Sequence, residues 1–145
     1  MSRGLCVLAA LAILAGGCAS RRAVDRLESE VGRLRTELAE YFDRKRKVFT
    51  FPLHAPGTPF EERVWKALLT IPYGEVRSYT DIANAVGAPK AVRAVGRANG
   101  MNRIAIVIPC HRVIGKDGSP VGYGGGLWRK QRLLDLERGV SSLEL

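Results

Sequence analysis

The adjacent residues Cys110 and His111 are the pair in this sequence best suited to covalent chemistry. A thiol is a strong nucleophile only as the thiolate, and a neighbouring imidazole is a common means of favouring that form. Before the pair, the apolar run 104–108 (Ile-Ala-Ile-Val-Ile) predicts a strand buried on both faces, and Pro109, which cannot donate to a sheet ladder, marks its end. The pattern predicts a nucleophile at a strand-to-turn junction. In the alternative interpretation Cys110 is a small core residue, since free cysteine is among the most buried residue types.

The elements that would position this pair are predicted to be mostly helical. Residues 58–61 (Thr-Pro-Phe-Glu) and 78–81 (Ser-Tyr-Thr-Asp) each place a capping hydroxyl three residues before an acid, which is the pattern of a helix N-terminus. The second helix is expected to run to about Val86, and after the turn 87–89 (Gly-Ala-Pro) a third helix covers residues 90–99. Two short helices around a turn that contains Gly and Pro predict a helix-turn-helix unit.

The third predicted helix combines small and basic residues: Ala91, Ala94, Gly96, Ala98 and Gly100 are small, and Lys90, Arg93 and Arg97 are basic. Small side chains allow close approach to another surface, and basic ones reach phosphates or base edges. Long polar side chains that read bases are scarce, which favours binding of DNA by shape. The alternative is tight helix–helix packing with a basic outer face.

The residues after the Cys-His pair predict a wing and a final helix. Residues 113–114 and 121–123, around the turn 116–119 (Lys-Asp-Gly-Ser), predict a small hairpin. Three glycines, 124–126, follow, and they indicate either close backbone approach to a ligand or a flexible linker. The last helix is expected at about Leu127 to Arg138, with Gly139 as its end. Glu137 near its C-terminus opposes the helix dipole, which predicts a partner such as a histidine or an arginine.

The composition suits one compact domain with an appendage and a basic surface. The chain has 145 residues and a formal charge of +9, of which residues 48–145 carry +5 (13 Lys and Arg against 8 Asp and Glu) and residues 1–47 carry +4 (10 against 6). A basic domain favours a polyanionic partner, either nucleic acid or an anionic membrane surface. The two histidines and three cysteines lack ligand spacing, so we expect no metal.

The first 18 residues have the pattern of an export signal. A short basic start precedes an apolar run at residues 5–15, and Gly16-Gly17-Cys18 follows, similar to a bacterial lipoprotein processing site with Cys18 as the lipidated residue and membrane anchor. The run is too short to span a bilayer. The alternative is a wrongly chosen start codon or a gene fusion.

Residues 19–47 predict a charged heptad helix and a basic linker. Apolar residues recur at alternating spacings of three and four, at Val24, Leu27, Val31, Leu34, Leu38 and Tyr41. Fewer than three heptads suit either a short stalk for weak self-association or an amphipathic helix that packs on the domain. The run 44–47 (Arg-Lys-Arg-Lys) is interpreted as a solvated linker, and the domain itself as residues 48–145.

Several motifs in order resemble one family, the C-terminal domain of the O6-alkylguanine-DNA alkyltransferases, also called methylated-DNA-protein-cysteine methyltransferases. The matching residues are 71–76 (Ile-Pro-Tyr-Gly-Glu-Val), Ser78-Tyr79, 91–96 (Ala-Val-Arg-Ala-Val-Gly), Asn102, 108–113 (Ile-Pro-Cys-His-Arg-Val) and 123–127. The resemblance covers about residues 41–137. It implies a mostly α fold with a small β element, in which a winged helix-turn-helix-like catalytic domain follows the signal-like segment and the short heptad helix.

The resemblance implies a single-turnover repair reaction without a cofactor. The alkyl group of O6-alkylguanine, foremost a methyl group, would move irreversibly to Cys110, and the resemblance extends this to O4-alkylthymine. His111 would take the thiol proton through a bound water, and Glu137 would orient that histidine. The related alkyltransferase-like proteins bind alkylated bases without a reactive cysteine, and Cys110 separates this chain from them.

The resemblance also implies how a base inside double-stranded DNA reaches the thiol. The base must leave the stack. Arg93 would fill its place, with Ala94 and Gly96 in the minor groove and little sequence specificity. Tyr79 would push the phosphate of the nucleotide and protonate guanine N3. Asn102 would brace the turn before the active site. The DNA or the alkylguanine would be contacted by Ser78, Tyr123 and Gly124.

Two features of this sequence depart from the family pattern. The N-terminal sheet-and-helix domain is missing except for a helix near Leu38 to Arg46. An export signal would carry the protein away from chromosomal DNA, its expected substrate. On the basis of the expected function, we predict a cytoplasmic protein and not a membrane lipoprotein. The alternative function is a membrane-anchored lipoprotein that carries an inactive or DNA-binding-only domain.

Overall fold

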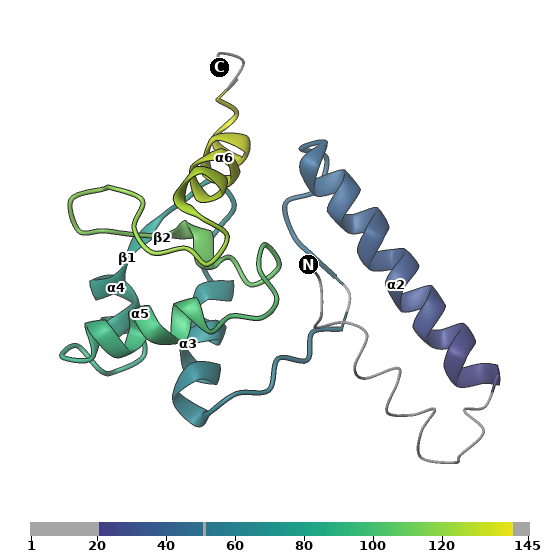
Figure 1. Cartoon of the computed structure of the whole chain (residues 1–145), viewed down its shortest axis with the longest axis horizontal. Coiled ribbons are helices and arrows are strands. Elements are labelled where there is room, and N and C mark those ends of the chain that lie inside the picture. Colours follow the sequence, from purple (N-terminus) through teal and green to yellow (C-terminus); the bar gives the residue numbers. More distant parts are fainter. Residues whose placement is uncertain (1–20, 51, 141–145) are drawn as a thin grey trace.

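Helices make up most of the described chain, which comprises residues 21–50 and 52–140 of a computed structural model (Figure 1). The elements in chain order are α2 (Arg21–Phe42), α3 (Pro59–Leu69), β1 (Arg77–Ser78), α4 (Tyr79–Ala85), α5 (Val92–Gly100), the 3-10 helix η1 (Cys110–Arg112), β2 (Val113–Ile114) and α6 (Leu127–Arg138). The predicted class, mostly α with a small β element, is confirmed for this part of the chain. The signal-like segment 1–18 with Cys18 lies outside the described residues.

The helix ends follow local capping chemistry. The Thr58 side chain accepts from the Glu61 backbone N–H while the Glu61 carboxylate accepts from the Thr58 backbone N–H at 2.8 Å, and Ser78 and Asp81 repeat this arrangement at the start of α4. At the other end of the domain, Gly139 adopts the left-handed conformation (φ 74°) and closes α6. Both predicted capping boxes and the predicted end of α6 are therefore confirmed.

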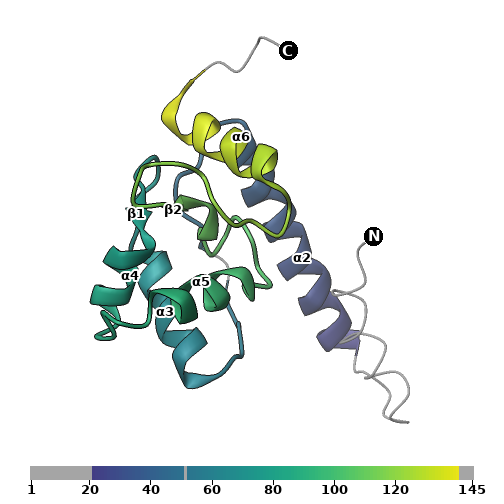
Figure 2. The ribbon, with the colours of Figure 1, turned by 60° about the vertical axis from the view of Figure 1, so that its left-hand side comes forward.

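The core lies where α3, α4 and α5 meet beneath η1 (Figures 1 and 2). The side chains of Val64, Leu68 and Val95 are fully buried in it, together with Val113. The Trp65 indole also donates to the carbonyl oxygen of Ala98 at 2.9 Å and ties α3 to α5. The helix-turn-helix unit is thus held from behind by α3, which leaves one face of α5 free.

The strand predicted at 104–108 is wrong. This segment forms a tight turn with one isolated bridge between Ala105 and Ile108, and Ile106 has a φ of 75°. The amide of Asn102 closes the turn, donating to the Ile108 carbonyl at 2.8 Å and accepting from the Ile104 N–H at 2.9 Å. Because this side chain and the turn satisfy the backbone groups, the apolar run needs no neighbouring strand.

The predicted hairpin is also wrong. Residues 113–114 pair in parallel with β1, in the register Arg77 with Val113 and Ser78 with Ile114, and residues 121–123 form no strand. The ammonium group of Lys130 donates to the carbonyl oxygens of Val113 and Val121. A charged group therefore lies between the two segments and takes the acceptors that a ladder would use. The turn 115–119 does form, with a hydrogen bond from the Gly115 N–H to the Ser119 carbonyl at 2.8 Å.

Helix α2 packs on the domain only through its last turns (Figure 2). Tyr41 is fully buried, whereas Val24, Leu27 and Val31 of the same seam are 43%, 54% and 57% exposed. The alternative of an amphipathic packing helix thus holds for one end of α2. No helix of the described residues is long and apolar enough to cross a bilayer.

The basic run 44–47 is not simply a solvated linker. Arg46 lies 2.6 Å from the carboxylate of Glu40 and 3.7 Å from that of Glu37. Glu37 in turn accepts from the backbone N–H and the hydroxyl of Thr50. These contacts turn the chain back at the end of α2 and hold that end against the domain.

Candidate active site

Cys110 lies at the start of η1, almost fully buried. Its backbone N–H donates to the Ile108 carbonyl at 2.8 Å, and its carbonyl accepts from the Asn99 side chain at 3.3 Å. Burial raises the pKa of the thiol, against the opposing effects of a hydrogen bond from Asn102 and the charge of Lys130. The resting thiol is therefore neutral, and a base must remove its proton before it can attack.

His111 is a buried base held from one side. Its Nε2 lies 2.8 Å from Glu137 Oε1, and Nδ1 is buried with no hydrogen-bond partner among the described residues. Burial lowers the pKa of His111, and Glu137 only partly offsets this. A carboxylate can only accept, so Nε2 carries the proton in the neutral ring and Nδ1 is left as an acceptor. His111 therefore presents one unused lone pair inside the protein.

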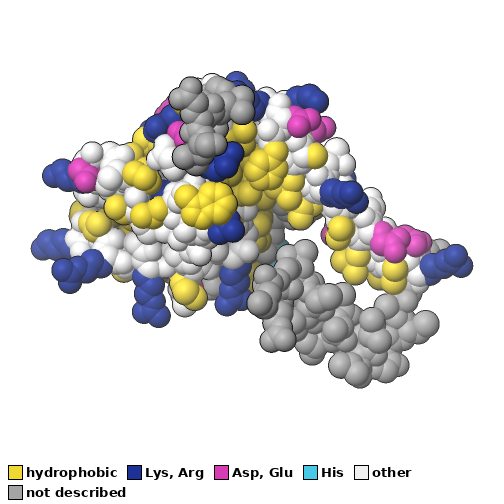
Figure 3. Space-filling model, turned by 45° about the horizontal axis from the view of Figure 1, so that its top comes forward, with side chains coloured by type: hydrophobic (Ala, Val, Ile, Leu, Met, Phe, Trp, Pro, Cys, Tyr) yellow, Lys and Arg dark blue, Asp and Glu magenta, His cyan; other side chains and the backbone are white. Residues whose placement is uncertain are grey.

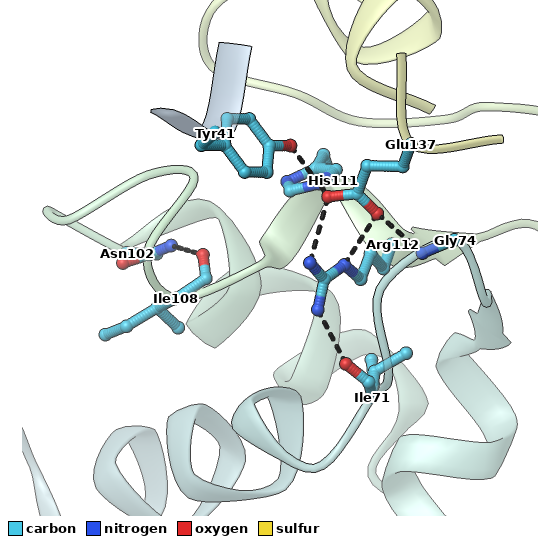
Figure 4. A network of polar contacts seen from close by, with 8 residues as sticks. All are labelled: Tyr41, Ile71, Gly74, Asn102, Ile108, His111, Arg112 and Glu137. Carbon is cyan, nitrogen blue, oxygen red and sulfur yellow. Dashed lines mark hydrogen bonds and ion pairs between the residues drawn. The ribbon is translucent and has the colours of Figure 1, made fainter. Parts of the chain in front are cut away.

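Glu137 is the centre of the network in Figure 4. Besides His111, its carboxylate accepts from Arg112 Nε and Nη2, both at 2.9 Å, from the Tyr41 hydroxyl at 2.7 Å and from the Gly74 N–H at 3.0 Å. Burial alone would raise the pKa of Glu137, but the hydrogen bonds from His111 and Arg112 outweigh it and hold the pKa well below its usual range. The predicted partner of Glu137, a histidine or an arginine, is confirmed, and both are present.

Three members of this network were missed from the sequence. Arg112 stands within the Cys-His motif, and its Nη1 also donates to the Ile71 carbonyl at 2.6 Å. Gly74 has a φ of 80°, and a Cβ there would lie 3.3 Å from the Glu137 backbone carbonyl oxygen, so only glycine suits this position. The sequence Pro-Tyr-Gly at residues 72–74 was therefore a usable signal of a tight turn. Tyr41 ended the heptad seam and carried no signal that separated it from the other seam residues.

Lys130 is a further buried group that the sequence interpretation passed over. Its side chain is fully buried, and burial lowers its pKa to about 8. The two carbonyls that it binds belong to Val113, next to η1, and Val121, before the glycine loop. Lys130 lies three residues before Leu133, on the apolar face of α6, and this spacing could have indicated that it is buried.

Tyr79, Tyr123 and Asn102 lie around the cysteine. Both tyrosines pack on the core cluster that contains Cys110, and burial, together with the nearby cysteine, raises their pKa values, that of Tyr123 to about 12. The Tyr79 hydroxyl donates to the Val121 carbonyl at 3.1 Å. The structure thus brings these three predicted residues together with Cys110.

The remaining predicted residues lie on the outside. Arg93 and Ala94 are exposed on α5, and Gly96 faces Tyr79, whose ring would be 3.8 Å from a Cβ at that glycine. Ser78 is occupied as the cap of α4, and Gly124 is exposed on its loop. Basic side chains project from the edge of the domain in Figure 3. No group of three or more potential metal ligands occurs in the described residues.

The fold and the site together define the class: a helix-turn-helix domain with basic residues on α5 and a buried cysteine, histidine and glutamate beside it. Residues 59–139 match the family described as 6-O-methylguanine DNA methyltransferase, DNA binding domain. The chain belongs to this family.

Relatives and solved structures agree with this assignment. The methylated-DNA-protein-cysteine methyltransferase of Mycobacterium tuberculosis is 56% identical over 109 residues, covering 75% of this chain and 66% of the relative. The inducible enzyme of that name from Bacillus subtilis is 55% identical over 106 residues, covering 73% of this chain and 59% of the relative. This chain therefore spans 59% to 66% of the length of these two relatives, which is less than two thirds.

Two structures with DNA show similar folds. The structure of M. tuberculosis OGT in complex with DNA has a TM-score of 0.75 at 54% identity and covers 77% of this chain and 70% of that one. S. pombe Atl1 in complex with damaged DNA containing O6-carboxymethylguanine has a TM-score of 0.51 at 33% identity, covering 57% of this chain and 79% of that one.

Proposed function

We propose that this protein repairs double-stranded DNA by moving an alkyl group, foremost methyl, from guanine O6 to Cys110 in a single turnover. One observation carries the proposal: a buried neutral thiol stands next to a histidine whose Nε2 is bound by a carboxylate and whose Nδ1 is unused. The names of the relatives support the same reaction. O4-alkylthymine is the second substrate that we propose.

The proposed step balances as a displacement. His111 takes the thiol proton through a water at Nδ1, and the imidazolium is stabilised by Glu137. The thiolate sulfur attacks the alkyl carbon, the carbon–oxygen bond breaks, and its electron pair remains on guanine O6. Tyr79 is protonated at neutral pH, since burial raises its pKa above the ordinary value, and it donates a proton to guanine N3. Through solvent, this proton then moves to N1, where unmodified guanine carries it, and the proton held by His111 returns to the Tyr79 phenolate. The product is restored guanine and a thioether, which has no easy leaving group.

The proposed DNA contact is the free face of α5 in the minor groove. Arg93 would occupy the place of the extruded base, and Ala94 and Gly96 allow close approach of the helix. Ser78 and Gly124 would contact the backbone or the base, Tyr123 would bind around guanine O6, and Asn102 would hold the turn before Cys110. Because few side chains on this face read bases, we expect little sequence specificity.

The rest of the proposal concerns the N-terminal part. We assign the repair domain to residues 48–145, and the cytoplasm as its location, because that is where a chromosome is available. The exposed seam residues Val24, Leu27 and Val31 support weak self-association, which sedimentation of the full chain at increasing concentration would detect. The lipoprotein alternative rests on residues 1–18, outside the described part of the chain.

Intact-mass measurement tests the function. The full chain is incubated with duplex DNA that carries O6-methylguanine, and the modified peptide is mapped. We expect a gain of one methyl group at Cys110, and none in Cys110→Ala. A folded wild-type protein that gains no methyl group would exclude the proposal.

A further inference from the structure

Helix α2 contributes a polar group to the buried network from 96 residues away in sequence. The Tyr41 side chain is fully buried, and its hydroxyl donates to Glu137 Oε1 at 2.7 Å. The same oxygen lies 2.8 Å from His111 Nε2. Figure 4 shows the phenol and the imidazole meeting at this one carboxylate oxygen. Tyr41 therefore contacts the group that orients the proposed base.

We propose that Tyr41 is a positioning residue for alkyl transfer: its hydroxyl holds Glu137 Oε1 on His111 and so makes the reaction depend on α2. This inference rests on the proposed function. It places a requirement of the chemistry outside residues 59–139, the part that matches the family.

The distribution of donors explains why one hydroxyl matters. Glu137 Oε1 accepts hydrogen bonds from the Tyr41 hydroxyl, His111 Nε2 and Arg112 Nη2. Glu137 Oε2 accepts hydrogen bonds from Arg112 Nε and the Gly74 N–H. Three of these five donors belong to Arg112 and Gly74. Tyr41 is the donor from α2, so its loss frees the carboxylate to move toward Arg112 and away from the imidazole. Hydrogen bonds to charged groups are among the stronger ones in proteins.

Glu137 also acts on the charge state of His111, because its hydrogen bond and its negative charge raise the pKa of the imidazole against the effect of burial. The other charged or titratable groups around this site are Arg112 on η1, Lys130 on α6, Cys110 and Tyr73, with Arg44 and Lys47 beside Tyr73. Without the Tyr41 hydroxyl to hold it, the carboxylate would stabilise the imidazolium less, and the pKa of His111 would fall further. A purely packing role for the phenol ring predicts no such change.

The experiment compares Tyr41→Phe with Tyr73→Phe in the full chain. Tyr73 lies in the same aromatic cluster, 5.9 Å from Tyr41 between ring centroids, and its buried hydroxyl has no hydrogen-bond partner among the described residues. Both variants keep the ring and lose one hydroxyl. Thermal melting first establishes that each variant is folded.

Two readouts separate this inference from the proposed function. The first is the single-turnover rate of methyl transfer from pH 5 to 9. We expect Tyr41→Phe to be about tenfold slower, with its acid limb moved to lower pH, and Tyr73→Phe to match the wild type. The second is the pH titration of the His111 imidazole by NMR, which needs no substrate, with the exposed His54 as the internal reference signal.

The outcomes are distinct. A wild type that transfers nothing overturns the proposed function, and the His111 titration then still decides whether Tyr41 acts on the base. An unchanged titration in Tyr41→Phe overturns the positioning role, as does an unchanged rate in an active protein. Equal effects of the two variants would show that the loss of any buried hydroxyl in this aromatic cluster, and not of the hydrogen bond to Glu137, is responsible, and would also overturn the positioning role.

Discussion

The buried network around Glu137 and the exposed face of α5 differ in how they are built. The Glu137 carboxylate has donors from α2, the turn at Gly74 and η1, so its geometry depends on segments that are far apart in sequence. Arg93 and Ala94, in contrast, are exposed on a single helix. The proposed chemistry is therefore a property of the tertiary structure, whereas the proposed DNA contact is a property of one helix and its spacing. Substitutions in the two regions should therefore fail in different ways.

The largest effect is expected from Glu137→Gln. The amide cannot accept all the donors that meet at this position, and Arg112 would remain buried without its counter-ion. Removing one partner of a buried ion pair costs about 3–5 kcal/mol. Chemical denaturation should show this loss of stability together with a loss of methyl transfer. A variant that keeps full stability would contradict the central role assigned to this carboxylate.

The next effect is expected from Arg93→Ala, which should leave stability unchanged because the side chain is exposed. Stabilising an extruded base involves a few kcal/mol, so the rate on duplex O6-methylguanine should fall by about 100-fold. The rate with a small free alkylguanine serves as the control and should be unaffected. Equal losses on both substrates would refute the role of Arg93 as the residue that replaces the base.

Acidification should act on the buried network and spare the face of α5. The folded-state pKa values of His111 and Glu137 both lie below their usual values of 6.5 and 4.5. The unfolded chain therefore binds more protons, so each group contributes stability that is complete above its usual value and is lost as the pH falls below it. Each group contributes a slope of at most about 1.4 kcal/mol per pH unit. Denaturation curves from pH 8 to 3 should show both windows, and Glu137→Gln should lack the lower one.

The smallest effect is expected from Ser78→Ala. The Ser78 hydroxyl accepts from the Asp81 N–H at 3.1 Å, and its loss should cost about 1 kcal/mol of stability, as for other helix caps. Thr58→Ala provides a matched cap at α3, and Thr58 is not among the proposed DNA contacts. If Ser78 also contacts DNA, Ser78→Ala should weaken duplex binding more than Thr58→Ala does. Equal binding of the two variants would reduce Ser78 to a structural cap.

Features encoded within a few residues could be predicted from the sequence. The two capping boxes and the end of α6 at Gly139 followed from side-chain chemistry at fixed spacings. The position of Glu137 at a helix C-terminus predicted that it has a histidine or an arginine as a partner, but not which one. The motifs around Cys110 were sufficient to place the chain in its family. These features depend on local hydrogen bonds or on the order of residues, both of which a sequence contains.

The tertiary structure decided which distant groups meet. The apolar run at 104–108 predicted a strand, but the Asn102 amide satisfies its backbone, and Lys130 occupies the space where the predicted hairpin would pair. Tyr41 looked like any other seam residue until the fold placed its hydroxyl on Glu137. Periodicity reports which side of an element is apolar, but the partner of a buried polar group depends on how the segments pack. For this protein the sequence determined the candidate reactive residues and the helix ends, and the packing of α2, η1 and α6 determined how those residues are held.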